Sequence, residues 1–303
     1  MQGIRAGLVA GSGGISMRSV LPILTVLLAI VVLWYGAAMK LNSVWTYDQA
    51  ARAGTDPTFV DVINDTMMQE RPVLPAPHQV AKGLWDGLAG QAITSKRSLV
   101  YHGWVTLAAT VFGFAIGTGL GIVLAVGIVH NKAMDLSVMP WAIASQTVPI
   151  LAIAPMVIVV LASLNVTGLL PKAVISAYLS FFPVLVGMVK GLRSPDAMQL
   201  DLLRTYNASK AATFWKLRLP ASMPYLFASL KVGVAASLVG TIVGELPAGA
   251  TAGLGARLLS GSYYGQTIQI WSALFAAAAL AAALVVVIGG IERLTLKRMG
   301  MAR

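Results

Sequence analysis

The sequence predicts an all-α, polytopic membrane protein with about six transmembrane helices. Of its 303 residues, 57% are hydrophobic and only 11% are charged, and the mean hydropathy is +0.78. Soluble domains carry roughly a quarter charged residues, so this composition excludes a soluble globular enzyme and a disordered regulator. The apolar residues also gather in six runs of about 20 residues, the length that a helix needs to cross a hydrocarbon core of about 30 Å.

The first apolar run covers residues 20–39 and follows a basic leader, residues 1–19, that holds Arg5 and Arg18. A cleaved signal peptide is the alternative interpretation, because the leader is basic and residues 36–38 are small. The apolar region of a signal peptide has roughly 7–15 residues, and this run is longer. We therefore interpret it as a retained first transmembrane helix.

A polar segment, residues 40–101, separates this run from the next, and we predict that it is periplasmic. Its prolines between Arg71 and Pro77 exclude a helix throughout that stretch. From His78 to Leu88 the apolar residues fall on one side of a helix, which predicts a short amphipathic helix at the membrane surface. Residues 42–71 match no pattern that indicates a role.

Five further apolar runs predict the remaining transmembrane helices, at 102–129, 138–163, 170–190, 225–244 and 269–291. Within the first of these, Gly113, Gly117 and Gly121 recur every fourth residue. Small residues at this spacing allow two helix backbones to approach closely. We therefore expect a tight helix contact along this face.

The net charge of +11 reports the orientation of the chain in the membrane rather than a nucleic-acid partner. In apolar chains, Lys and Arg gather in the cytoplasmic loops. If both termini are inside, the inner loops and the tail, residues 292–303, are rich in Lys and Arg, whereas the short outer loops hold only Lys172 and Arg257. The sequence therefore predicts that both termini are cytoplasmic.

The most charged inner loop, residues 193–220, also carries apolar residues that a merely solvated loop does not need. We predict a short helix from about Pro195 to Tyr206, a break at residues 207–209, and a second helical piece that ends near Pro220. Leu203, Tyr206, Phe214 and Trp215 suggest a docking surface for a cytoplasmic partner. Packing against the inner mouth of the helix bundle is the alternative, and periodicity alone leaves both open.

This loop resembles the cytoplasmic loop of ABC importer permeases, whose pattern is Glu-Ala-Ala, three residues, Gly, nine residues and Ile-x-Leu-Pro. In register, Asp201 stands for the Glu and Asn207 for the Gly. We expect Asp201 in the first helical turn, where an acid favours the helix dipole, and Asn207 in a left-handed turn. The resemblance implies that the ATPase-coupling residues are Asp201, Leu202, Leu203, Tyr206, Asn207, Ala208, Leu219 and Pro220.

Three other stretches resemble the nitrate/sulfonate/taurine branch of these permeases: residues 74–77, residues 149–155 and the region from Gly244 to Gly255. The resemblance implies a type I ABC importer-like transmembrane domain in the bacterial inner membrane, with a five-helix core at 102–291. It implies a second permease copy, two ATPase subunits that hold ATP and Mg, and a periplasmic or lipid-anchored binding protein.

The expected function is therefore import of a small solute: a nitrate-, sulfonate- or taurine-like anion or zwitterion, or a small heterocycle. We expect no enzymatic activity and no cofactor on this chain, because it lacks the Gly-x-x-x-x-Gly-Lys-Ser/Thr phosphate loop. A secondary transporter that works as a dimer of six-helix subunits is the alternative. Its usual signs are interrupted helices and an internal inverted repeat, and we see no convincing duplication.

Polar side chains at membrane depth are candidates for the solute pathway, because lipid makes them costly elsewhere. Ser and Thr often bond to their own helix instead, and Glu245 has solvation or a pair with Arg257 as alternatives. The three His residues are scattered and predict no metal site. The candidate pathway residues are Gln146, Thr147, Ser176, Ser180, Ser237, Thr241 and Glu245.

Overall fold

A computed structural model describes residues 17–247 and 250–301, and the side chains from residue 21 onward. All of its regular structure is helical over these residues. Most of the predicted leader, residues 1–16, and residues 302–303 of the predicted tail lie outside the described residues. The chain divides into two compact units between Gln79 and Val80, which is inside the polar segment predicted for 40–101.

The first unit is built on α1 (Met17–Ala53), which runs well past the predicted end at residue 39. The helix continues because α2 (Phe59–Met68) and the chain after it fold back onto its polar end. Asn42 is fully buried there; its Nδ2 donates to the Leu74 carbonyl at 2.9 Å and its Oδ1 accepts from the Leu74 N–H at 3.1 Å. The proline-rich stretch after α2 is irregular, as predicted.

The predicted amphipathic helix is confirmed as α3 (Pro77–Leu88), within which the boundary between the two units falls. Four of the other predicted spans are also confirmed as single helices. Their bounds are α4 (Leu99–His130), α7 (Leu169–Leu192), α10 (Leu219–Glu245) and α12 (Thr267–Arg298). With α1, the described residues contain five helices that are long and apolar enough to cross a membrane.

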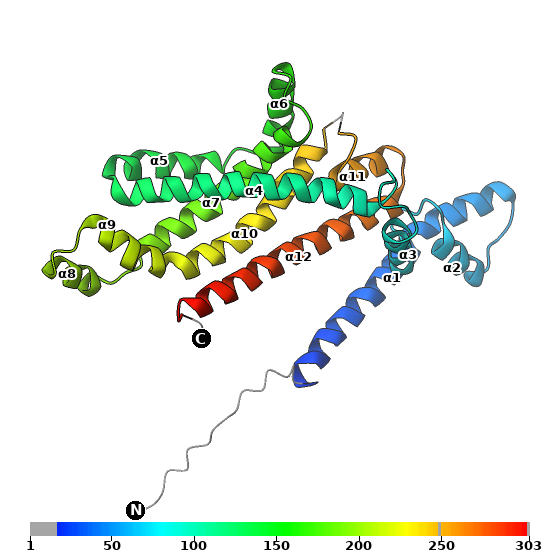
Figure 1. The fold of residues 1–303 in the computed structure, drawn as a ribbon. Helices are drawn as coiled ribbons and strands as arrows, with labels where there is room; N and C mark the ends of the chain where they lie inside the picture. The colour runs from blue at the N-terminus through cyan, green and yellow to red at the C-terminus, as the bar shows by residue number, and fades with distance from the viewer. Residues whose placement is uncertain (1–16, 248–249, 302–303) are drawn as a thin grey trace, which may run out of the picture. The chain divides into compact units, whose positions relative to one another are not determined.

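The span predicted at residues 138–163 is not one continuous helix. The structure has α5 (Lys132–Ser145) and α6 (Ile150–Ser163), which are bent by 98° at the residues between them. Val148 precedes Pro149, and a proline ring disfavours the helical conformation of the residue before it. As a result, α6 projects from the bundle in the second unit (Figure 1). The bent pair counts as a sixth span if it crosses as one.

The core of the second unit is a bundle in which α7 lies between α4 and α10 (Figure 1). The glycine steps of α4 make the predicted close contact with α7. A Cβ on Gly117 would lie 2.7 Å from the Ala177 carbonyl oxygen, and one on Gly121 would lie 2.7 Å from that of Phe181. Phe181, Leu185 and Met188 of α7 fill the apolar core toward the end that carries α8 (Ala197–Thr205).

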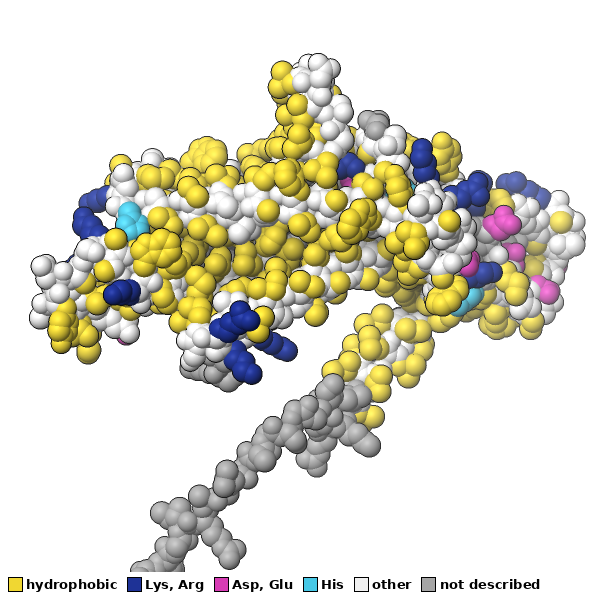
Figure 2. All heavy atoms as spheres, in the orientation of Figure 1, with side chains coloured by type: hydrophobic (Ala, Val, Ile, Leu, Met, Phe, Trp, Pro, Cys, Tyr) yellow, Lys and Arg dark blue, Asp and Glu magenta, His cyan; other side chains and the backbone are white. Residues whose placement is uncertain are grey.

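The outside of this bundle is apolar. Figure 2 shows hydrophobic side chains over its visible flank, with Lys and Arg gathered toward the ends. Val123 of α4 and Val286 of α12 are among the large apolar residues that are exposed there. An apolar belt between charged ends is the surface that a lipid bilayer covers.

Candidate functional site

The loop at residues 193–220, predicted as a docking surface and here called the docking loop, contains α8, which starts one turn earlier than the position of Asp201 implies. Asp196 is its N-cap and forms a capping box with Gln199. Asp201 therefore lies in the second turn, and the prediction that it occupies the first turn is wrong. Its carboxylate accepts a hydrogen bond from Arg204 at 3.0 Å on the helix surface instead.

The predicted break after α8 is confirmed. Asn207 has a φ of 55°, in the left-handed region, which Asn tolerates better than most residues. The Ala208 N–H then donates to the Leu203 carbonyl at 2.9 Å and closes the end of the helix. Ser209 accepts a hydrogen bond from Ala212 and caps α9 (Lys210–Thr213).

The prediction that the second helical piece ends near Pro220 is wrong. One turn of π-helix, η1 (Phe214–Arg218), joins α9 directly to α10, with the Leu219 N–H donating to the Phe214 carbonyl. Proline in a regular helix collides with the carbonyl four residues earlier. The wider π-turn precedes Pro220 and accommodates it, so that the helix continues from the loop into the bundle.

An apolar stripe runs along the outer side of α8. Met198, Leu202 and Tyr206 recur every fourth residue and are 82%, 56% and 76% exposed, so they share one helix face. We call these three residues the α8 stripe. Leu203 flanks the stripe and is half-buried. Sequence reasoning missed Met198, although its spacing from Leu202 was the available signal.

The base of the docking loop is fixed to the bundle. The Arg218 guanidinium donates to the Leu192 carbonyl of α7 at 3.2 Å, and Arg193 forms a 2.8 Å ion pair with Asp135 of α5. The Phe214 ring contacts the His130 ring at the end of α4, with centroids 5.3 Å apart. Residues before and after α8 are therefore tied to α4, α5 and α7.

The predicted pathway residues of α7 and α10 are all fully buried and lie in contacts between helices. Ser176 donates to the Ser237 carbonyl at 2.9 Å, and Ser237 donates to the Thr110 carbonyl of α4 at 3.0 Å. Thr241 and Ser180 bond to carbonyls of their own helices, as the alternative interpretation expects. The structure gives these residues a packing role, and their contact with a solute stays a prediction.

Two other predicted pathway residues, Gln146 and Thr147, lie at the bend between α5 and α6. Gln146 is half-buried and Thr147 is exposed. The Thr147 hydroxyl donates to the Ala144 carbonyl at 2.8 Å. Neither side chain touches the buried polar residues of α7 and α10 in any hydrogen bond found among the described residues.

Glu245, at the end of α10, is the centre of a buried polar network. Thr106 of α4 donates to its carboxylate at 2.9–3.0 Å, and the Lys172 ammonium of α7 lies 3.5 Å from Oε1. The Gly255 N–H donates to Oε2 at 2.9 Å. The two alternatives for Glu245, solvation and a pair with Arg257, are both wrong, because the carboxylate points inward to these three partners. We call Thr106, Lys172, Glu245 and Gly255 the Glu245 network.

The Glu245 network fixes the start of α11 (Leu254–Tyr263). The Leu254 N–H donates to the Thr106 hydroxyl at 2.8 Å, and the Gly253 N–H donates to His102 Nδ1 at 3.0 Å. The first N–H groups of a helix need such partners. Gly253 has a φ of +126°, and a Cβ there would lie 2.1 Å from the Glu245 carboxyl carbon, so only glycine fits.

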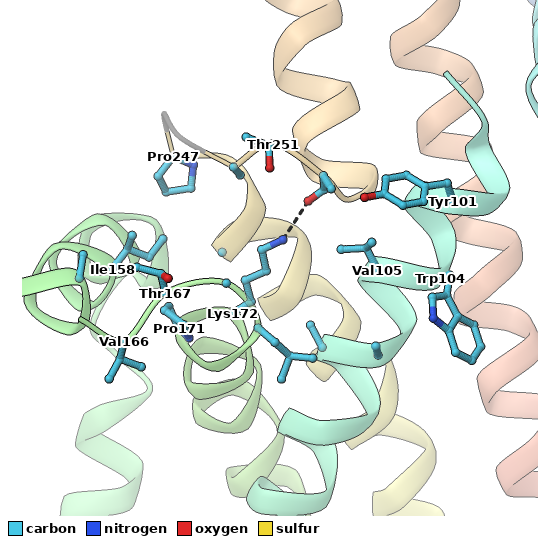
Figure 3. Close-up of a pocket in the computed structure, with 18 residues that line it drawn as sticks. Tyr101, Trp104, Val105, Ile158, Val166, Thr167, Pro171, Lys172, Pro247 and Thr251 are labelled. Carbon is cyan, nitrogen blue, oxygen red and sulfur yellow. Dashed lines mark hydrogen bonds between the residues drawn. The ribbon is translucent and has the colours of Figure 1, made fainter. Parts of the chain in front are cut away.

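A pocket of about 600 Å³ opens beside the Glu245 network. Figure 3 shows Tyr101 and Trp104 of α4 on one side of it, Ile158 of α6 on the other, and Lys172 between them. The Lys172 ammonium is already engaged, because it donates to the Ala252 carbonyl at 2.8 Å and faces Glu245. None of the seven predicted pathway residues lines this pocket.

The described residues contain no group of three or more His, Asp or Glu side chains that could hold a metal ion. The site chemistry within this part of the chain is therefore that of a helix bundle: hydrogen bonds between helices, one buried ion pair, an apolar pocket and an exposed loop. Such a multi-helix arrangement with interhelical polar contacts is typical of membrane transport proteins.

Comparison with known families supports this assignment. Residues 117–300 match the family described as binding-protein-dependent transport system inner membrane component. The chain belongs to this family of ABC transporter permeases, which are multi-pass proteins of the bacterial inner membrane. Its members are not enzymes, because ATP hydrolysis resides in a separate subunit.

Several named transport permeases are similar to the chain. The formylaminopyrimidine transport permease of Halalkalibacterium halodurans is 30% identical over 194 residues, which cover 64% of this chain and 72% of that protein. The riboflavin transport system permease of Chloroflexus aurantiacus is 28% identical over 225 residues, 74% of this chain and 80% of that protein. The nitrate import permease of Synechocystis sp. is 23% identical over 144 residues, 47% and 50% of the two chains.

Proposed function

We propose that the chain translocates a small solute delivered by a binding protein, and that it is driven by a separate ATPase which docks on the loop at residues 193–220. The observation that carries this proposal is the α8 stripe, whose apolar side chains are exposed beyond the end of the bundle. Exposed apolar anchors of this kind dominate the binding energy of protein interfaces. Family membership favours this importer over a secondary transporter.

A continuous helical segment connects the docking loop to the pocket. The loop continues through η1 into α10 without a break, and α10 has 27 residues, a length of about 40 Å. Its far end is Glu245, which holds Lys172 beside the pocket. A displacement of the loop by the ATPase would therefore move the wall of the pocket.

For the solute, we propose a small planar heterocycle in preference to a simple anion. The pocket offers the rings of Tyr101 and Trp104, whereas its ammonium group, that of Lys172, is already balanced by Glu245. An anion would have to compete with this buried carboxylate. Two of the relatives are named for transport of a pyrimidine and a flavin, which agrees with this chemistry.

Uptake by reconstituted vesicles tests the proposed function. We expect accumulation of a labelled pyrimidine or flavin solute only when the binding protein, the ATPase and ATP are all present. A fivefold excess of unlabelled heterocycle should compete, whereas nitrate and an alkanesulfonate should not. Uptake that needs an ion gradient and no ATP would contradict the importer, and competition by nitrate alone would contradict only the proposed solute.

We further propose that both termini are cytoplasmic.

We also propose that two copies of the chain pair through the projecting α6. The exposed side chains of α6 include Met156 and Val160, and α6 lines one wall of the pocket. A second copy seated on α6 would cover this apolar surface and close the pocket, and so would place the solute pathway between the two copies.

Cysteine cross-linking tests the pairing, and the chain has no cysteine of its own. With a short bis-maleimide in membranes, Met156→Cys and Val160→Cys are each expected to give a dimer band. The control Val286→Cys places a cysteine on the exposed face of α12, where we expect only monomer. Equal cross-linking of all three variants would indicate random collision and would contradict pairing through α6.

A further inference from the structure

A second, polar pocket lies in the second unit, where the end of α3, the start of α12 and the middle of α11 come together. Its volume is about 490 Å³, and its charged lining residues are Asp86, Arg97 and Arg257. Gln269 and other amide side chains line it as well. None of these residues belongs to the Glu245 network or to the docking loop.

Two glycines of α3 allow the walls of this pocket to approach each other. A Cβ on Gly83 would lie 2.6 Å from the Ser272 hydroxyl of α12, and one on Gly87 would lie 2.6 Å from Leu99 of α4. Both distances are below normal contact, so a larger residue at either position would push the Ser272 or Leu99 side chain aside. At this pocket α3 therefore lies closely against α4 and α12.

The side chain of Arg257 has an unsatisfied donor. Its Nε is buried and has no hydrogen-bond partner among the described residues, although its carbonyl accepts from Gln269 at 3.0 Å. The ion pairs formed within the described chain include neither Arg257 nor Arg97. A buried donor without an acceptor is costly, and this one belongs to a group that always carries charge.

The two guanidinium groups also act on each other. Burial, and then the positive charge of Arg97, lower the pKa of Arg257 in α11. Like charges that face one cavity repel unless an opposite charge lies between them. Asp86 is the one carboxylate of the lining; it is exposed and leaves the three charged groups with a net charge of +1.

We propose that this pocket binds an oxyanion, meaning a carboxylate, sulfonate or phosphate group held between Arg97 and Arg257. Guanidinium groups present planar pairs of N–H donors that match the oxygen atoms of such groups. An oxyanion would supply an acceptor to the Arg257 guanidinium, which lines the pocket, and would separate the two positive charges. A free solute and a lipid headgroup carry the same chemistry, and the experiment distinguishes these two sources.

The test uses the full chain in phosphatidylcholine nanodiscs, titrated with sulfate against chloride at matched ionic strength. We expect a saturable rise in the thermal unfolding midpoint of the wild-type protein. Arg257→Gln and Arg97→Gln should each weaken the apparent sulfate affinity by about tenfold or more, the loss expected for one charge-assisted hydrogen bond. Asp86→Asn should tighten it, because the substitution removes a repelling carboxylate.

The matched control is Lys96→Gln, which removes the same charge from an exposed neighbour of Arg97 that does not line the pocket. We expect its sulfate response to equal that of the wild type. If Arg257→Gln fails to fold, Arg97→Gln still tests the proposal, because Arg97 is exposed and its replacement should leave the chain folded. An equal sulfate response in Arg97→Gln and wild type, or an equal loss in Lys96→Gln, would overturn the proposal.

Repeating the titration in phosphatidylglycerol nanodiscs identifies the source of the oxyanion. A free solute as the ligand predicts the same sulfate affinity in both lipids. A lipid headgroup as the ligand predicts that phosphatidylglycerol competes with sulfate, and that less of this lipid stays bound to Arg97→Gln than to wild type. No sulfate response in either lipid, with equal lipid retention, would show that the pocket holds no oxyanion.

Discussion

Replacing Glu245 with Ala is expected to destabilise the protein by about 3–5 kcal/mol, because it leaves the largely buried Lys172 ammonium without its opposite charge. The substitution also removes the acceptor of the Thr106 hydroxyl and of the Gly255 N–H. The start of α11 would then lose its attachment to α10. We expect a lower unfolding midpoint of the purified protein and loss of solute uptake, with ATPase binding unchanged.

The double variant Glu245→Gln with Lys172→Gln separates the effect of the two charges from the effect of the hydrogen bond with Gly255. It removes both charges and keeps an oxygen that can accept from Gly255, so that it should recover at least half of the lost stability. Glu292→Gln is a control, since Glu292 pairs with Lys231 between α10 and α12 in a more exposed setting, and we expect a smaller loss. If Glu245→Ala unfolded at the wild-type temperature, the network would not hold α11 in place.

Replacing Leu202 or Tyr206 with Asp is expected to break the complex with the ATPase while leaving the permease folded. Both side chains are exposed on the α8 stripe, so that a charge there costs the isolated chain little. At an interface, the same charge would be desolvated without a partner, and loss of an apolar anchor alone costs about 2 kcal/mol or more. We expect affinity to fall at least about 30-fold, measured by co-purification and by ATPase activity in the assembled complex.

Ala197→Asp is the matched control, because Ala197 is exposed and places the same charge next to Met198 but on a different side of α8. The ATPase should bind this variant almost normally. Met198→Asp should resemble Leu202→Asp, since both residues lie on the stripe. An intact complex with Leu202→Asp and Tyr206→Asp would rule out the stripe as the docking surface.

Sequence reasoning succeeded where one strong local signal decides the structure. Apolar length fixed α4, α7, α10 and α12 to within a few residues for most ends, and the glycine steps of α4 predicted its contact with α7. The left-handed Asn207 also followed from local chemistry. In each case the structure is decided by the free energy of membrane burial or of a single backbone conformation, and contacts between distant residues matter less.

The burial of Glu245 was missed because it depends on residues far apart in the chain. Glu245 is polar and near a helix end, which suggested a solvated or pathway-lining group, but Thr106 and Lys172 arrive from two other helices and bury it. Hydropathy also averaged α5 and α6 into one span, because both flanks of the bend are apolar. The sequence also did not predict that the helix continues past Pro220. Proline usually ends a helix, and here it follows a π-turn.

The bend between α5 and α6 has a consequence for biosynthesis. With 14 residues, α5 is about 21 Å long and too short to cross a hydrocarbon core of about 30 Å by itself. The bend also leaves carbonyl groups that lipid cannot satisfy. The Ser145 carbonyl accepts hydrogen bonds from the nearby Val148 N–H and from the hydroxyl of Tyr178, which belongs to α7 and leaves the ribosome later. We therefore expect the α5–α6 elbow to reach its final position only after α7, a segment made later, has entered the membrane.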